Sequence, residues 1–93
     1  MKKIGQNAFI NNYNLKKLSL PNNIETIEYR SFENCKSLTE LVVPNGVKTI
    51  EEDAFANCEN LEKVEILNSS TEIEKDAFLN CNKLVNISYS HKA

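Results

Sequence analysis

Apolar residues recur along this chain at a fixed spacing, and polar residues fill the positions between them. Three columns of identical residues each repeat with a step of 23 residues. The columns are Ile4, Ile27, Ile50 and Ile73; Phe9, Phe32, Phe55 and Phe78; and Leu15, Leu38, Leu61 and Leu84. A step of this length is typical of a solenoid, in which one small unit is stacked on itself. We therefore predict one solenoid domain over residues 1–93, with units of about 4–26, 27–49, 50–72 and 73–93.

Each unit carries the pattern of a short strand with one buried face. In the second unit Leu41 and Val43 alternate with Val42, which predicts that Val42 points outward. Pro44 has no N–H to donate and should end the strand, and the Asn-Gly pair that follows favours a turn. Stacked units should align these strands as a parallel sheet, about 4.8 Å apart.

The rest of each unit predicts two further inward segments. Val47 and Ile50 indicate a brief extended stretch with two buried side chains. A small residue followed by Phe, as in Ser31-Phe32, is consistent with a turn of helix that places the Phe in the middle of the coil. Asp53 and Asp76 precede this turn and suit a helix start. The expected fold class is an α/β repeat solenoid with a parallel β-sheet and short helical turns.

Charge and composition exclude several functions. The net charge is −2 and the pI about 5.4, whereas nucleic-acid-binding proteins are usually basic. No stretch approaches the ~20 apolar residues of a membrane span, and Met1-Lys2-Lys3 is not followed by the apolar run of a signal peptide. As written, the chain is expected to be cytoplasmic, with no nucleic-acid partner and no membrane insertion.

The order of residues within the unit resembles that of a known family. The matching segments are Ala8-Phe9, Ser31-Phe32-x-x-Cys35, Ala54-Phe55-x-x-Cys58, Ala77-Phe78-x-x-Cys81, Leu15-x-x-Leu18-x-Leu20-Pro21 and Leu38-x-x-Leu41-x-Val43-Pro44. Together they resemble the BspA-like leucine-rich repeat family, from Ile4 to Tyr89. The resemblance implies a multi-repeat protein of adhesion and protein recognition, without enzymatic activity. It also implies a cell-surface or secreted location if the chain is part of a longer member.

Two polar columns are candidates for chemical sites. Cys35, Cys58 and Cys81 share one column, where parallel side chains give poor disulfide geometry and do not converge on a metal. We interpret them as small buried thiols of the core. Asn11, Asn34, Asn57 and Asn80 form a second column and should satisfy turn hydrogen bonds. The single histidine, His91, has no nucleophile nearby in the repeat frame, so we expect no enzyme, no cofactor and no metal.

Two surfaces are candidates for a protein partner. The first consists of the outward strand positions: Lys17, Ser19, Glu40, Val42, Lys63, Glu65, Asn86 and Ser88. Solenoids commonly bind partners across such a surface. The second is an acidic column, Glu28, Glu51 and Glu74, with Glu52, Asp53, Glu72 and Asp76 nearby and Arg30, Lys48 and Lys75 opposite. This column either binds a basic surface or is a solvated face with some lysine pairing.

The ends of the stack are the last candidates. No unit carries the polar cap that a solenoid end requires. The apolar residues that should be exposed there are Ile10, Tyr13, Leu84, Ile87 and Tyr89. The sequence therefore predicts a non-catalytic protein–protein interaction module. The alternative is a structural element that self-assembles through its terminal repeats, as a closed dimer or as a filament.

Overall fold

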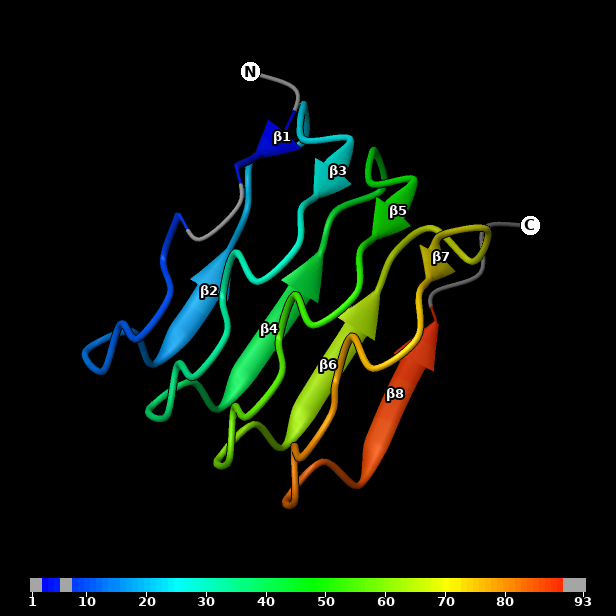
Figure 1. The fold of residues 1–93 in the computed structure, drawn as a ribbon. Coiled ribbons are helices and arrows are strands. Elements are labelled where there is room, and N and C mark those ends of the chain that lie inside the picture. Colours follow the sequence, from blue (N-terminus) through cyan, green and yellow to red (C-terminus); the bar gives the residue numbers. More distant parts are fainter. Residues whose placement is uncertain (1–2, 6–7, 90–93) are drawn as a thin grey trace.

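The chain winds into two parallel β-sheets that face each other across one hydrophobic core (Figure 1). The computed structural model describes residues 3–5 and 8–89. The longer strands are β2 (Lys17–Ser19), β4 (Glu40–Val43), β6 (Lys63–Ile66) and β8 (Asn86–Tyr89). The shorter strands are β1 (Lys3–Ile4), β3 (Thr26–Ile27), β5 (Thr49–Ile50) and β7 (Glu72–Ile73). The sheet orders are β2-β4-β6-β8 and β1-β3-β5-β7.

The pairing register follows the period of the sequence. Leu41 of β4 lies opposite Val64 of β6, and Ile27 of β3 lies opposite Ile50 of β5, so each pair is separated by one 23-residue step. Each step is one turn of the solenoid. We number these turns, as far as they are described, coil 1 (residues 4–5 and 8–26), coil 2 (27–49), coil 3 (50–72) and coil 4 (73–89).

The two sheets arise from different local patterns. In β4 and β6 exposed and buried residues alternate strictly, and Val43, the last residue of β4, directly precedes Pro44. The second sheet is only two residues wide in each coil. The brief extended segment expected around Ile50 is therefore hydrogen-bonded between coils and forms a sheet of its own.

The core consists of the predicted apolar columns. Phe32 and Phe55 are fully buried, as are Ile27, Ile50 and Leu38. The side chain of Ile4 lies outside the described part of the chain. Neighbouring phenylalanine rings of the four coils stack with centroids 5.1, 5.1 and 5.4 Å apart and almost parallel planes. This ladder fills the space between the sheets and the connecting turns.

The predicted helical turns do not form in the described residues. The segment between β3 and β4 consists of hydrogen-bonded turns, as do its counterparts. Arg30, Asp53 and Asp76 have φ of 58°, 59° and 61°, whereas a helix N-cap residue has an extended backbone. The interpretation of Asp53 and Asp76 as helix starts is therefore wrong.

Hydrogen bonding between coils explains why the turn is not helical. The backbone N–H of Phe32 donates to the Ala54 carbonyl at 2.8 Å, and that of Asn34 donates to the Ala56 carbonyl at 2.8 Å. A helix would direct these N–H groups to carbonyls four residues back. The turns thus form a third hydrogen-bonded column that joins the coils, beside the two sheets.

Candidate interaction surfaces

The strand face is the outer surface of the sheet β2-β4-β6-β8, and its predicted residues all point to solvent. Eight side chains are exposed there: Lys17, Ser19, Glu40, Val42, Lys63, Glu65, Asn86 and Ser88. The register arranges them in two rows across the sheet. One row is Lys17, Glu40, Lys63 and Asn86, and the other is Ser19, Val42, Glu65 and Ser88. Unlike charges therefore alternate along the first row.

A groove of about 430 Å³ lies on this strand face, over β4, β6 and β8. Glu40 and Lys63 border it, together with Val42 and Glu65. Val85, which is 86% exposed, adds an apolar wall just before β8. The sequence pattern missed Val85 because the residue precedes the alternating stretch. A signal was present, since its counterparts in the other coils are all polar: Lys16, Thr39 and Glu62.

The acidic column makes contacts within the molecule. The Tyr29 backbone N–H donates to Glu51 Oε1 at 3.0 Å, and the Glu52 backbone N–H donates to Glu74 Oε1 at 3.2 Å. Each of these carboxylates thus accepts from the turn of the preceding coil. Glu28 and Glu51 are half-buried and Glu74 is exposed. Glu51 and Glu74 therefore join neighbouring coils, a role that sequence reasoning did not find because it depends on geometry between coils.

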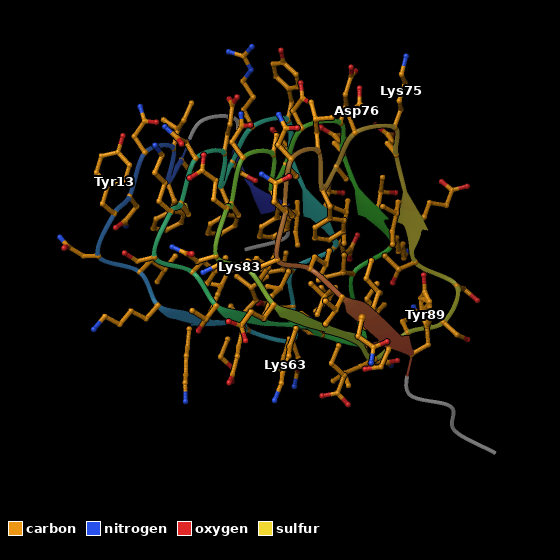
Figure 2. The ribbon with its side chains drawn as sticks, turned by 90° about the horizontal axis from the view of Figure 1, so that it is seen from below. Tyr13, Lys63, Lys75, Asp76, Lys83 and Tyr89 are labelled. Atoms are coloured by element: carbon orange, nitrogen blue, oxygen red, sulfur yellow. The ribbon has the colours of Figure 1, made fainter. Side chains whose placement is uncertain are left out.

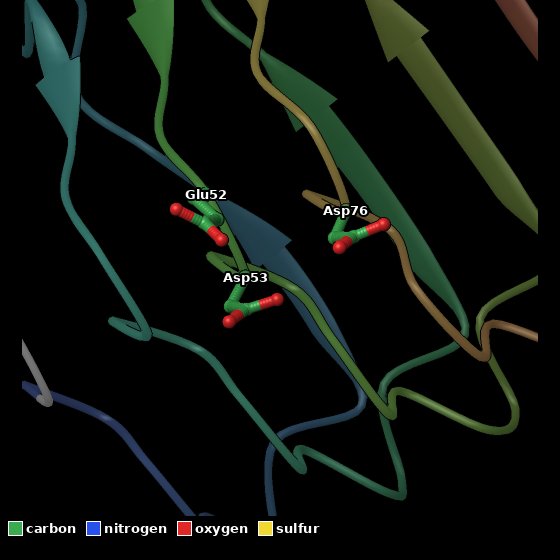
Figure 3. A group of neighbouring side chains, drawn as sticks. All are labelled: Glu52, Asp53 and Asp76. Carbon is green, nitrogen blue, oxygen red and sulfur yellow. The ribbon is translucent and has the colours of Figure 1, made fainter.

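Three further acidic groups gather beside this column. One carboxylate oxygen each of Glu52, Asp53 and Asp76 lies within 4.8 Å of the others (Figure 3). The residues come from the turns that follow β5 and β7. Ca²⁺ requires about 6–8 oxygen ligands, so three carboxylates supply only part of such a set.

The three cations expected opposite the acidic column differ from one another in their surroundings. Arg30 Nε lies 3.2 Å from Glu33 Oε1 of its own coil, and its guanidinium stands 5.1 Å from the Tyr29 ring centroid. Lys48 and Lys75 are exposed. Lys63 projects from the strand face on the side of the molecule opposite Lys75 and Asp76 (Figure 2). The strand face and the acidic column are thus opposite surfaces.

The cysteine column belongs to the core. Cys35, Cys58 and Cys81 are buried and carry free thiols. Their Sγ atoms donate to the backbone carbonyls of Phe9, Phe32 and Phe55 of the preceding coil, at 3.3, 3.3 and 3.2 Å. Hydrogen bonds with the neighbouring thiols and burial raise the pKa of Cys58. Cys58 therefore stays a protonated and unreactive thiol at neutral pH.

The residues of the asparagine column form the turns through their backbone conformation. Asn11, Asn34, Asn57 and Asn80 have φ of 61°, 65°, 62° and 60°, a left-handed conformation that asparagine tolerates better than most residues. Side-chain bonds also link coils: Asn34 Nδ2 donates to Asn11 Oδ1 at 2.8 Å and to Tyr13 Oη at 3.4 Å, and Asn80 Nδ2 donates to Asn57 Oδ1 at 2.9 Å.

The end faces, formed by coils 1 and 4, expose apolar side chains. Tyr13 is 53% exposed at one end and Tyr89 is 42% exposed at the other (Figure 2). The other predicted residues, Ile10, Leu84 and Ile87, are half-buried. The structure adds two that the prediction did not include, since Phe9 and Leu79 are 41% and 43% exposed. Their internal counterparts Phe32, Phe55 and Ala56 are buried.

Two remaining features concern catalysis and membranes. His91 lies outside the described residues, so the structure does not place it. Across residues 3–5 and 8–89 there is no helix long and apolar enough to cross a membrane.

Comparisons with known proteins place this geometry in a family. The family model of the BspA-type leucine-rich repeat region matches residues 2–93. It counts six copies of its repeat, whereas the 23-residue alignment of the sequence gives four units. No curated protein matches the chain.

One solved structure also matches the chain. It is the crystal structure of a leucine-rich cell surface protein from Faecalibacterium prausnitzii A2-165, similar with 39% identity and a TM-score of 0.87. The match covers 95% of this chain and 23% of that one, so the chain spans about a quarter of the length of that protein. The repeat unit, the parallel solenoid and the family match agree, and the chain belongs to the BspA-type leucine-rich repeat family.

Proposed function

We propose that this chain is a non-catalytic protein-interaction module that binds a protein partner through its strand face. The observation that carries the proposal is the groove over β4, β6 and β8, which combines Glu40 and Lys63 with the exposed Val85. Backbone pairing holds these positions in a rigid sheet, so little ordering is required on binding. The proposal involves no cofactor, no nucleic acid and no membrane insertion.

The chemistry of the groove favours a partner of mixed charge. Glu40 and Lys63 are neighbours across β4 and β6, so a partner must present a basic and an acidic group about one strand spacing apart. Val42 and Val85 offer apolar contact on either side. No aromatic residue borders the groove, and aromatic anchors carry much of the energy in tight interfaces. We therefore expect modest affinity from one copy.

The strand face is preferred over the acidic column as the main contact. Glu51 and Glu74 already accept backbone hydrogen bonds from the preceding coil. A basic partner on Glu28, Glu51 and Glu74 would compete with that role. An adhesive, cell-surface or secreted role is part of the proposal, and it is supported by the similarity to a leucine-rich cell surface protein. A cytoplasmic location, expected from the sequence as written, is the alternative.

Charge reversal on the two opposite faces tests the proposal. Lys63→Glu lies in the groove, and Lys75→Glu is a matched reversal on the other side of the molecule. A partner captured by the wild-type chain should lose at least about tenfold in affinity with Lys63→Glu and keep its affinity with Lys75→Glu. The measurement is a titration by biolayer interferometry. Equal binding by both variants would refute the strand face as the site.

The second candidate function is self-assembly through the terminal coils, giving a homo-oligomer. The observation that favours it is the exposure of Phe9 and Tyr13 on coil 1 and of Leu79 and Tyr89 on coil 4. Apolar side chains gathered on an end face mark a surface that gains free energy when covered. Light scattering across a range of concentrations tests this candidate, and a strictly monomeric chain would refute it.

A further inference from the structure

We propose that Asn45-Gly46 is a site of spontaneous modification, where the folded chain converts an asparagine to aspartate or isoaspartate with water as the only co-reactant. The pair lies in the turn that connects β4 to β5 (Figure 1). This turn belongs to coil 2, which has a coil on either side, and the inference is independent of the proposed interaction surfaces. It rests on two unengaged groups, the side-chain amide of Asn45 and the backbone nitrogen of Gly46.

The geometry of the turn leaves both groups accessible. The Val47 N–H donates to the Pro44 carbonyl at 3.2 Å, so Asn45 and Gly46 are the two central residues. Neither has a positive φ, as in a type I turn. Asn45 is exposed and Gly46 is half-buried. The closing hydrogen bond is at the long end of the usual range, so it opposes the bond rotations of the reaction only weakly.

The two reacting groups have no hydrogen bond to break first. Among residues 3–5 and 8–89, the Gly46 N–H has no acceptor and the Asn45 side-chain amide has no partner. The Asn45 backbone carbonyl does accept from Asn68 Nδ2, at 3.0 Å. That bond holds the turn against the next coil without engaging the reacting atoms. Glycine has no Cβ to obstruct the approach of its nitrogen to the Asn45 Cγ.

The chemistry is an exchange of an amide for a carboxylate. The Gly46 nitrogen gives its proton to water or hydroxide and forms a bond with Asn45 Cγ, and the amide nitrogen leaves as ammonia. Water then opens the resulting succinimide ring. Breaking the new N–Cγ bond gives aspartate, and breaking the original peptide bond gives isoaspartate, in which the main chain runs through the side chain. One water is consumed, no electrons are transferred, and one negative charge is added to the net charge of −2.

The equivalent asparagine of coil 3 shows what protection looks like. Asn68 Oδ1 accepts from the Ser70 backbone N–H at 2.9 Å, while its Nδ2 donates to the Asn45 carbonyl. Both ends of that amide are engaged, and the residue that follows it is Ser69. We therefore expect Asn68 to stay intact.

Coil 1 provides the closest comparison. Its turn contains Asn22-Asn23 at the same positions, and it is closed by the Ile24 N–H and the Pro21 carbonyl at 3.3 Å. The main difference is the side chain of Asn23, which obstructs attack by its own nitrogen. The reactivity of coil 2 is thus assigned to one missing side chain in a turn that both coils share.

The isoaspartate product should weaken the junction with coil 1. Gly46 approaches that coil so closely that a Cβ would lie 2.4 Å from the Asn22 carbonyl oxygen. Isoaspartate lengthens the main chain by one methylene next to this contact. The aspartate product keeps the main chain and only charges an exposed side chain, so its cost should be smaller.

Peptide mapping after ageing of the folded chain at neutral and mildly alkaline pH tests the site. Trypsin releases residues 37–48, in which Asn45 is the single asparagine, and residues 18–30, which contain Asn22. Peptide 37–48 should gain the mass of an amide-to-acid conversion, faster at higher pH, with isoaspartate identified by electron-transfer fragmentation. We expect Asn45 to react at least about tenfold faster than Asn22, a barrier difference of about 1.4 kcal/mol.

Two variants serve as matched controls. Asn45→Gln keeps the amide but lengthens the side chain, so it should abolish the reaction. Asn23→Gly recreates the reactive pair in coil 1 and should make Asn22 reactive. Circular dichroism verifies that both are folded. A peptide 37–48 that stays intact in the folded chain but reacts in urea would overturn the proposal, because the turn would then protect the pair. Aspartate without isoaspartate would overturn the succinimide route.

The effect on the junction is tested separately. Ion exchange isolates the modified chain, and its isoaspartate form is compared with Asn45→Asp, which has the same charge and a normal main chain. The isoaspartate form should unfold at a lower urea concentration. Equal midpoints would overturn the predicted weakening of the contact between coils 1 and 2.

Discussion

Asn34 shows why one residue type recurs at the sharpest point of the turn. Its φ is 65°, and its Nδ2 donates to Asn11 Oδ1. A left-handed backbone costs most residues about 1–2 kcal/mol. We therefore expect Asn34→Ala to lower the free energy of unfolding by about 1–2 kcal/mol, measured by urea titration. Asn34→Gly keeps the backbone freedom and loses only the side-chain bond, so it should cost less. An equal loss in both variants would contradict this account.

Gly46 is required for a different reason, which is the space between coils. A Cβ on Gly46 would lie 2.4 Å from the Asn22 carbonyl oxygen and 3.4 Å from that of Ile24, and both are backbone atoms. Gly46→Ala should therefore destabilise the protein by about 1–3 kcal/mol, the usual cost of overpacking, in the same urea titration.

Gly5 provides the control, since a Cβ added there meets no atom within 4 Å. Gly5→Ala should be neutral or slightly stabilising, because alanine restricts the unfolded chain. If Gly46→Ala and Gly5→Ala changed the stability equally, the close approach of coils 1 and 2 would not explain why position 46 is a glycine.

Single residues also mark the limit of what the sequence can predict. The asparagine column is predictable as a turn feature, because asparagine signals turns in any context. Arg30 and Asp53 adopt the same left-handed conformation. Their side chains are chemically different, so residue type does not predict this conformation at either position. The sequence pattern consequently favours a helix start at Asp53, which is wrong. Tertiary hydrogen bonds between coils impose the conformation on these positions.

At the scale of elements, the phenylalanine ladder is the largest packing feature. Phe55 is fully buried between the rings of Phe32 and Phe78. Phe55→Ala should lower the free energy of unfolding by about 3–5 kcal/mol, because it removes a ring and leaves a cavity. Phe9 ends the ladder and is 41% exposed, so Phe9→Ala should cost clearly less. Thermal unfolding followed by circular dichroism compares the stability of the two variants. An equal loss of stability would refute the expectation that the ladder contributes less at its end.

The elements that the sequence predicts are those whose pattern is local. Alternation identifies β4 and β6 and the outward direction of their exposed residues, because a strand with one wet face needs a period of two. Two-residue strands such as β5 are too short to show a period. Their pairing becomes visible only when equivalent segments are stacked. The contacts of Glu51 and Glu74 with the preceding turn also depend on the stacking of coils, so the local sequence pattern does not predict them either.

At the scale of the molecule, the hydrogen bonds and ring contacts between coils in residues 3–5 and 8–89 join each coil to its neighbours. The two sheets, the turn column and the ring ladder all repeat with the same 23-residue step. In such a solenoid, stability is approximately a sum over coils and the interfaces between them. The number of coils should therefore set the stability, provided that an added coil keeps the register.

Duplicating residues 27–49 tests this additivity, because the added coil keeps the 23-residue step and creates only one new junction, between the two copies of coil 2. The five-coil protein should unfold at a higher urea concentration, in one transition, with an m-value larger by roughly one quarter, since m scales with the surface exposed on unfolding. Duplicating residues 27–46 instead breaks the 23-residue step. That insertion should lower the midpoint, because one junction would pair outward with inward strand positions. If the two insertions had the same midpoint, the register between coils would not be what holds the solenoid together.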